Sequence, residues 1–166
     1  MEAIIQKIVT REYDMMIRIN NIGGPASCQS QTDAFSLMRT SQFQVWTNVM
    51  LESYLGDLID AEASGRNLLF EKYAWMMEHS LPDAFAQVRH ALPVLPPEQL
   101  AEVEECVAME AVWAEECARR YPALARHGRP LRTVQDTPEQ TSMETYNRGE
   151  LRTYSRRTLT LYHDFL

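Results

Sequence analysis

Apolar residues recur every three or four positions along almost the whole chain, and this spacing limits the possible folds more than any other feature of the sequence. Such spacing places apolar side chains along one face of an α-helix. No segment shows the strict alternation of apolar and polar residues that is typical of a half-buried β-strand. We therefore predict an all-α protein, a single helical bundle of about five to six helices with one long central helix.

Capping residues, glycines and prolines divide this pattern into helices. Thr32 fits the N-cap of the long central helix, and Gly65 supplies its stop. The apolar stripe of this helix consists of Phe35, Met38, Val45, Val49 and Ile59. The last helix begins with a capping box in which Glu144 reaches back to the Thr141 amide. The predicted helices span residues 2–19, 32–64, 67–79, 83–92, 97–121 and 141–166, with a polar loop over 20–29 and an irregular connection over 122–140.

The composition is that of an ordinary globular protein. The 166 residues are 45% hydrophobic and 23% charged, which fits a single helical domain over residues 1–166. The net charge of −7 argues against a nucleic-acid binder, which normally carries a basic surface. The longest fairly apolar stretch without a charge, 40–51, is too short to span a bilayer, and no secretory signal opens the chain. Three cysteines without a CxxC pair fit a cytoplasmic protein with free thiols.

Charge is distributed unevenly along the chain. Residues 1–118 carry a net charge of −11, whereas residues 119–166 carry nine arginines, five acidic residues and a net charge of +4. The chain has 14 arginines and only two lysines. Arginine suits bidentate contacts with carboxylate or phosphate groups, although codon bias in a GC-rich genome explains the same excess.

The loop over residues 20–29 is rich in polar side chains and contains adjacent glycines. Gly23 and Gly24 allow backbone angles that are closed to other residues, and Pro25 fixes the next angle. A plain helix connection needs only about 2–8 residues of turn chemistry, so we interpret this loop as one wall of a binding site. Its candidate ligand-binding residues are Asn20, Asn21, Gly23, Gly24, Cys28 and Gln29.

Cys28 allows two interpretations. A cysteine beside a Gly-Gly turn and ahead of a helix is a candidate for activation as a thiolate. Catalysis would also need a base, and no histidine lies near it in the sequence. The alternative is a small buried hydrophobic residue, which is the commoner role of cysteine.

Four predicted helices each carry a glutamate within the apolar stripe, namely Glu12, Glu52, Glu110 and Glu150. Gln42 interrupts the stripe of the central helix in the same way. An unpaired, ionised carboxylate in a protein core is costly, so each glutamate needs a partner or must be neutral. These interruptions on four helices point to a shared polar interior.

Three interpretations of these glutamates remain open. In the first, they are structural, because they lie at stripe edges or pair with arginines such as Arg66 or Arg148. In the second, they line a small-molecule pocket, where they bind an amine or act as general acids and bases. In the third, they hold a metal. The catalytic candidates are Glu12, Glu52 and Glu150, and the candidate wall residues, which are otherwise core residues, are Gln42, Trp46 and Tyr54.

The metal interpretation lacks its usual signature. Dimetal centres in helical bundles use Glu-x-x-His pairs on two helices. No histidine of this chain follows a glutamate by three residues. We therefore predict no metal ligands and name no cofactor.

A second polar cluster covers residues 65–73. The N-terminus of the helix predicted over 67–79 attracts anions through its free amides and its dipole, and Arg66 precedes it directly. The alternative is ordinary capping by Asn67 together with a surface pair of Glu71 and Lys72. The candidate binding residues of this cluster are Arg66, Asn67, Lys72 and Tyr73.

A third polar cluster covers residues 141–151. Gly149 in the middle of a helix costs about 1 kcal/mol relative to alanine, which calls for the close approach of another helix or of a ligand. Tyr146 and Arg148 are candidate binding residues, and Tyr146 shares a face with Glu150. The alternative is a simple surface pair of Glu144 and Arg148.

Together these segments resemble the bacterial Domain of Unknown Function 4125 family. The resemblance spans nearly the whole chain and implies a complete family domain, but no particular activity. The matching segments are residues 20–29, Ser41-Gln42-Phe43 with Trp46, Glu52-Ser53-Tyr54-Leu55, Gly65-Arg66-Asn67-Leu68 with Lys72-Tyr73, and residues 141–151 with Thr153-Tyr154-Ser155.

These observations predict a protein that binds or transforms a small amino-acid-like or phosphorylated metabolite. Arg66 and Arg148 would hold its carboxylate or phosphate, and the glutamates would act on it. We favour an enzyme, because a binding module has less need for several internal carboxylates. One alternative is a non-catalytic interaction protein, whose acidic helix over 98–120 faces a basic partner or which forms a homodimer through helix 32–64. A lesser alternative is a carboxylate-ligated metal enzyme.

Overall fold

The computed structural model describes residues 1–20, 29 and 31–166. Within these residues every regular element is a helix and none is a strand, which confirms the all-α prediction. Four of the predicted binding residues, Asn21, Gly23, Gly24 and Cys28, lie outside the described residues.

The chain divides into two compact units, residues 1–70 (unit 1) and residues 71–166 (unit 2). The division falls within helix α4 (Leu68–Ser80), after its first turn. The predicted single bundle around one long central helix is not confirmed, because the longest helix of the described residues, α6 (Pro97–Arg120), belongs to unit 2.

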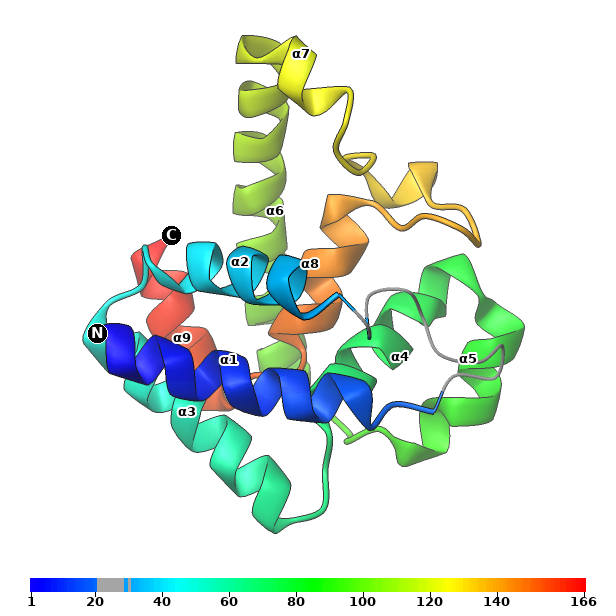
Figure 1. Cartoon of the computed structure of the whole chain (residues 1–166). Coiled ribbons are helices and arrows are strands. Elements are labelled where there is room, and N and C mark those ends of the chain that lie inside the picture. The colour runs from blue at the N-terminus through cyan, green and yellow to red at the C-terminus, as the bar shows by residue number, and fades with distance from the viewer. Residues whose placement is uncertain (21–28, 30) are drawn as a thin grey trace. The chain divides into compact units, whose positions relative to one another are not determined.

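Unit 1 is built from three helices that precede α4. They are α1 (Glu2–Ile17), α2 (Thr32–Phe43) and α3 (Asn48–Ala63), and both α2 and α3 pack against α1 (Figure 1). The apolar stripe of α1 forms the centre of this packing, since Ile8 and Met15 are almost completely buried. Phe43 of α2 and Leu51 and Leu58 of α3 are fully buried as well.

The prediction of one helix over residues 32–64 is wrong, because residues 44–47 separate α2 from α3. Thr47 has an extended backbone, and its side chain accepts a hydrogen bond from the Met50 amide, so it is the N-cap of a new helix. The N-cap of α2 is Gln31 rather than Thr32. The break alters which side chains face the core. Buried positions are Phe43, Trp46, Leu51 and Leu58, whereas four of the five residues of the predicted stripe are exposed, namely Met38, Val45, Val49 and Ile59.

The predicted stop at Gly65 is confirmed. Gly65 has a φ angle of 74°, which lies in the left-handed region that glycine adopts without strain. Its amide donates to the Glu62 carbonyl, and the Arg66 amide donates to the Ala61 carbonyl at 2.8 Å. This turn places Arg66 and Asn67 directly before α4.

Unit 2 is organised around α6, which packs against two helices near the C-terminus (Figure 1). Its core includes Val103, Val107, Leu151 and Leu159. Besides α6 and the rest of α4, its elements are α5 (Pro82–Val88), η2 (Arg89–Ala91), α7 (Pro122–Ala125), η3 (Thr133–Gln135), α8 (Met143–Leu151) and α9 (Arg156–Phe165).

The predicted last helix is also two helices, α8 and α9, each of which has a serine N-cap. Ser142 accepts from the Thr145 amide and Ser155 accepts from the Thr158 amide. The predicted capping box is wrong, because the Glu144 carboxylate accepts from the Thr133 amide at 2.8 Å. The Glu144 side chain thus holds the segment around Thr133 against α8.

Gly149 lies where α8 packs closely against α4. A Cβ atom at this position would lie 2.8 Å from the Met76 Cγ atom and 2.9 Å from the Lys72 carbonyl oxygen. Of the two reasons predicted for a glycine here, the close approach of another helix is therefore confirmed.

No helix in the described residues combines the length and the apolar character that crossing a membrane requires.

Candidate functional site

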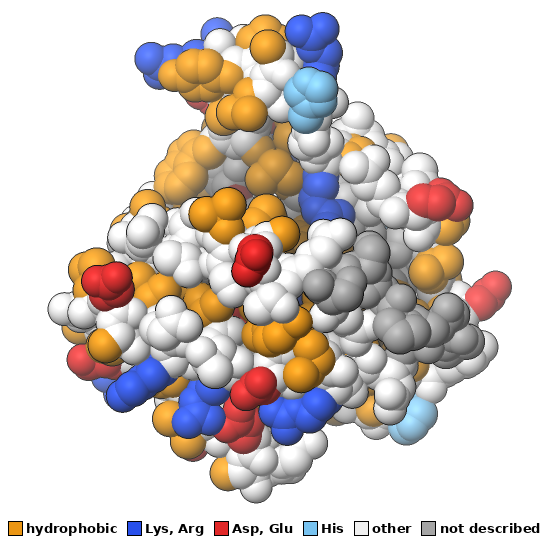
Figure 2. Space-filling model, viewed as in Figure 1, with side chains coloured by type: hydrophobic (Ala, Val, Ile, Leu, Met, Phe, Trp, Pro, Cys, Tyr) orange, Lys and Arg blue, Asp and Glu red, His pale blue; other side chains and the backbone are white. Residues whose placement is uncertain are grey.

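Unit 1 contains an open pocket of about 510 Å³ between the ends of three helices. The C-terminal half of α1, the end of α3 and the turn before α4 line it. We call it the arginine pocket, because three arginines are among the described residues of its wall. Two acidic residues and one asparagine line it as well. These polar wall residues are Arg11, Arg18, Arg66, Asp14, Glu62 and Asn67. Figure 2 shows basic and acidic side chains gathered over the C-terminal half of α1 on the face in view.

Asn67 holds the wall of this pocket together. Its Nδ2 atom donates to the Met15 carbonyl at 2.8 Å, and its Oδ1 atom accepts from the Phe70 amide at 3.0 Å. It therefore caps the first turn of α4, as one alternative proposed, and ties that turn to α1. The neighbouring Arg66 is exposed at the pocket wall.

Some of the charged side chains of the pocket contact one another. Arg11 and Glu62 form an ion pair. The Arg18 Nε atom donates to the Asp14 backbone carbonyl at 2.7 Å, not to the Asp14 carboxylate. Sequence reasoning missed Arg11, Asp14, Arg18 and Glu62, because it searched the apolar stripes for polar residues and took the polar faces as solvated. The available signal was the spacing of Arg11, Asp14 and Arg18, which places them close together on one face of α1.

Glu12 lies in a buried polar cluster elsewhere in unit 1. Its Oε2 atom accepts from the Arg39 Nε atom at 2.7 Å, and its Oε1 atom accepts from Arg39 Nη2 and, at 2.7 Å, from the Tyr54 hydroxyl. Arg39 also donates to the Gln42 Oε1 atom at 2.6 Å. Both oxygens of Glu12 are thus bonded, and the cluster joins α1, α2 and α3, which favours the structural interpretation for Glu12 with Arg39 as the unforeseen partner.

The other predicted wall residues of unit 1 have packing and capping contacts. Trp46 and Tyr54 are buried, with ring centroids 5.9 Å apart. Gln29 donates through Nε2 to the Met16 and Ile19 carbonyls, both at 2.9 Å, and so binds the C-terminal end of α1. Asn20 is exposed.

The three predicted catalytic glutamates do not share one environment. Glu12 is 0% exposed, whereas Glu52 is exposed on α3 in the same unit, so the prediction that Glu52 faces the interior is wrong. The helix break at residues 44–47 is the physical reason, because it rotates the stripe that was traced across it. Glu150 is buried but belongs to unit 2.

Glu150 is bonded to a lysine and a tyrosine. The Lys72 Nζ atom lies 2.6 Å from the Glu150 Oε2 atom, and the Tyr154 hydroxyl donates to Oε1 at 3.1 Å. Lys72 also lies 3.7 Å from the centre of the Tyr146 ring, a cation–π contact, and 5.9 Å from that of Tyr73. Because Lys72 is only 3% exposed, the alternative of a surface pair with Glu71 is wrong.

Glu110 of α6 belongs to the same interior. Its Oε1 atom accepts from the Tyr162 hydroxyl of α9, and its Oε2 atom is buried without a hydrogen-bond partner among the described residues. Burial raises the pKa of this carboxyl, and the nearby Glu150 charge raises it further, while hydrogen bonds from Tyr162 and Asn147 oppose the shift. Burial and the Glu110 charge raise the pKa of Tyr162 as well.

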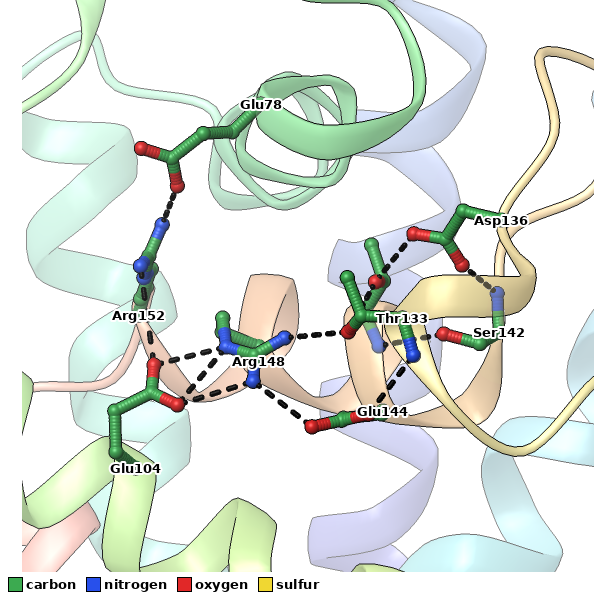
Figure 3. A network of polar contacts seen from close by, with 9 residues as sticks. Glu78, Glu104, Thr133, Asp136, Ser142, Glu144, Arg148 and Arg152 are labelled. Carbon is green, nitrogen blue, oxygen red and sulfur yellow. Dashed lines mark hydrogen bonds and ion pairs between the residues drawn. The ribbon is translucent and has the colours of Figure 1, made fainter.

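Arg148 is the centre of a second polar network in unit 2 (Figure 3). It donates to both carboxylate oxygens of Glu104, from Nε at 2.8 Å and from Nη2 at 3.0 Å, and to Thr133 and Glu144 at 3.0 and 3.2 Å. Burial lowers the pKa of Arg148, but its bonds to the two carboxylates outweigh this and raise it. Arg148 does pair with Glu144, but both side chains are half-buried and Glu104 is the closer partner, so the alternative of a simple surface pair is wrong. Arg148 already has carboxylate partners where a ligand anion was predicted.

The same network includes Arg152 and Asp136. Arg152 pairs with Glu78, and its guanidinium lies 5.0 Å from the centre of the Trp75 ring. Asp136 accepts from the Ser142 amide and the Thr145 hydroxyl, each at 2.6 Å. These contacts hold α4, α6 and the segment around η3 against α8. We therefore interpret this network as structural.

All glutamates of α6 have partners within unit 2. The partners come from residues 119–166, and four of them are arginines, so the basic segment of the chain offsets part of the negative charge of the acidic helix. The paired residues are Glu98 and Glu102 with Arg156, Glu104 with Arg148, Glu105 with His163, Glu110 with Tyr162, Glu115 with Arg132, and Glu116 with Arg119.

Two cysteines lie within the described residues. Burial and the glutamates around it raise the pKa of Cys106 to about 12, so its thiol stays protonated near neutral pH. Cys117 is exposed. The described residues hold no group of three or more His, Cys, Asp or Glu side chains that could bind a metal ion.

Comparisons with known proteins identify the family of this chain. No curated protein and no solved structure matches the chain. A family model described as "Protein of unknown function (DUF4125)" matches residues 2–166, in agreement with the resemblance carried by the polar segments. The chain therefore belongs to the DUF4125 family of proteins of unknown function.

Proposed function

We propose that this protein binds a small amino-acid-like or phosphorylated metabolite in the arginine pocket. The single observation that carries the proposal is the pocket itself, about 510 Å³ in volume and lined by three arginines at the turn before α4. Ligand pockets of proteins have volumes of about 300–1,000 Å³.

The chemistry of the lining supports an anionic group on the ligand. Guanidinium groups bind carboxylates and phosphates through paired hydrogen bonds. Arg66 precedes the N-terminus of α4, where the helix dipole also favours negative charge. Two of the predicted binding residues, Arg66 and Asn67, therefore belong to the proposed site, with Asn67 as its support.

We propose binding and assign no reaction to the pocket, because the predicted catalytic glutamates of unit 1 do not line it. Glu12 is bonded at both oxygens to Arg39 and Tyr54, and Glu52 is exposed away from the pocket lining. Neither is therefore available to the pocket as a general base.

The test is a ligand screen with the full chain and two matched variants. We expect at least one metabolite of the proposed classes to raise the melting temperature, since a ligand at 100 times its Kd stabilises the folded state by about 2.7 kcal/mol. Arg66→Gln should weaken its binding at least about tenfold, because a hydrogen bond to a charged group contributes about 1.5–3 kcal/mol. Lys7→Gln changes an exposed base of α1 outside the pocket lining and should leave the affinity unchanged.

Isothermal titration calorimetry measures the affinity of each variant. The proposal is wrong if no metabolite of either class binds, or if Arg66→Gln and Lys7→Gln have equal effects.

A homodimer through α2 is a second candidate function. One observation favours it: Leu37 and Met38 of α2 are 70% and 69% exposed. Figure 2 shows hydrophobic side chains gathered over α2 on the face in view.

A further inference from the structure

We infer that the ligand of the arginine pocket is a zwitterion with a free carboxylate and a free ammonium group, as in an α-amino acid. This inference rests on the proposed function and selects one of its two ligand classes. The observation behind it is that charges of both signs line the pocket in nearly equal number.

The balance of charge argues against a phosphate monoester. Arg11, Arg18 and Arg66 oppose Asp14 and Glu62, so the described residues of the wall carry a formal charge of only +1. A phosphate monoester carries a charge of about −1.5 to −2 near pH 7. Its second negative charge would be repelled by the two wall carboxylates. A zwitterion is neutral overall and can use both signs.

The Asp14 carboxylate is available to an ammonium group. It has no hydrogen bond or ion pair within the described part of the chain, and its neighbour Arg18 donates to the backbone carbonyl of Asp14 rather than to the carboxylate. Asp14 is exposed, so an ammonium group can reach it from the open pocket.

The helix ends reinforce this arrangement of charges. Asp14 lies in the last turn of α1, whose C-cap is Arg18, and Glu62 lies in the last turn of α3. The C-terminal end of a helix carries partial negative charge, which favours a cation. At the end of α1, Arg18 and Asn67 already donate to backbone carbonyls. Arg66, on the third side of the pocket, precedes the positive end of α4. The ammonium group should therefore lie near Asp14 and Glu62, and the carboxylate near Arg66.

Calorimetry with chemically matched probes tests the inference on the full chain. The probes are the twenty common L-amino acids, their N-acetyl derivatives, their C-terminal amides, and glycerol 3-phosphate. We expect at least one free amino acid to bind, and we expect its N-acetyl and amide derivatives to bind at least about tenfold more weakly, since each loses one charged contact.

A pair of aspartate variants assigns the ammonium contact. Asp14→Asn should weaken binding of the free amino acid at least about tenfold and leave the weak binding of its N-acetyl derivative unchanged. Asp33→Asn, at an exposed position of α2 outside the pocket lining, should change neither.

Three outcomes would overturn the inference, and they separate it from the proposed function. Equal binding of an amino acid and its N-acetyl derivative excludes an ammonium contact. Binding of glycerol 3-phosphate that is lost in Arg66→Gln, with no amino acid bound, contradicts the zwitterion but leaves the proposed function standing. If no probe binds and no other phosphorylated metabolite does, both fall.

Discussion

Individual side chains explain why glutamates interrupt the apolar stripes. Glu12 and Glu150 are buried, as their positions predicted, and each has a basic partner, Arg39 and Lys72 respectively. Removing one partner from such a pair leaves an uncompensated buried charge, which is strongly destabilising. Glu110 differs, because its partners are a hydroxyl and an amide and one of its oxygens has no bond among the described residues.

Glu110 leads to a prediction about pH. The groups that face it are Tyr162 from α9 and Glu150 and Asn147 from α8. Because the pKa of Glu110 is raised in the folded protein, its stabilising contribution is complete below the ordinary carboxyl pKa of 4.5 and is lost as the pH rises through the raised value. Glu110→Gln keeps an acceptor for Tyr162 without the charge, so it should gain stability relative to the wild type as the pH rises from 4.5 to 8.

Urea denaturation across this pH range measures the effect. The control is Glu116→Gln, an exposed glutamate of the same helix, which should follow the pH dependence of the wild type. Parallel curves for Glu110→Gln and the wild type would show that the Glu110 carboxyl is not perturbed in the folded protein.

Three helices begin at a short polar side chain that caps them, and these three caps decide the fold locally. Thr47, Ser142 and Ser155 each accept a hydrogen bond from an amide three residues later. Two of these caps follow breaks that the apolar spacing had bridged, because spacings of three and four residues continue by chance across residues 44–47 and 152–155. Caps and periodicity therefore carry different information, and at these two breaks the cap marks a helix start that the periodicity does not show.

Gly149 and Gly56 form a matched pair for testing helix packing. Ala at position 149 would meet the Lys72 carbonyl oxygen, which cannot move without moving α4, and overpacking of this kind costs about 1–3 kcal/mol. Ala at position 56 of α3 would meet nothing within 4 Å, so the better helix propensity of alanine should stabilise the protein by up to about 1 kcal/mol. Chemical denaturation of the two variants should give shifts of opposite sign. Stabilisation by both would mean that α8 does not pack tightly on α4.

At the scale of the whole molecule, the exposed apolar surface of α2 bears on self-association. The exposed apolar side chains of α2 and of the segment after it have no cover within the described residues. If they form a homodimer interface, sedimentation velocity should show a fraction of dimer that rises with protein concentration. The double variant Leu37→Ser, Met38→Ser should be monomeric. Val94→Ser removes another exposed apolar side chain, in unit 2, and should leave the dimer intact. A wild-type chain that stays monomeric at every concentration excludes this second candidate.

Local interactions determined the part of this protein that its sequence alone could predict. The all-α class, the stop at Gly65 and the burial of Glu12 and Glu150 depend on helix periodicity and backbone sterics within a few residues. The tertiary structure alone decided that Arg39 neutralises Glu12, that Arg148 is bonded to Glu104, and that Arg11, Asp14 and Glu62 line one pocket. These facts join positions far apart in the sequence, and the physical reason is that charge pairing and pocket formation depend on the path of the backbone between them, which local propensities do not encode.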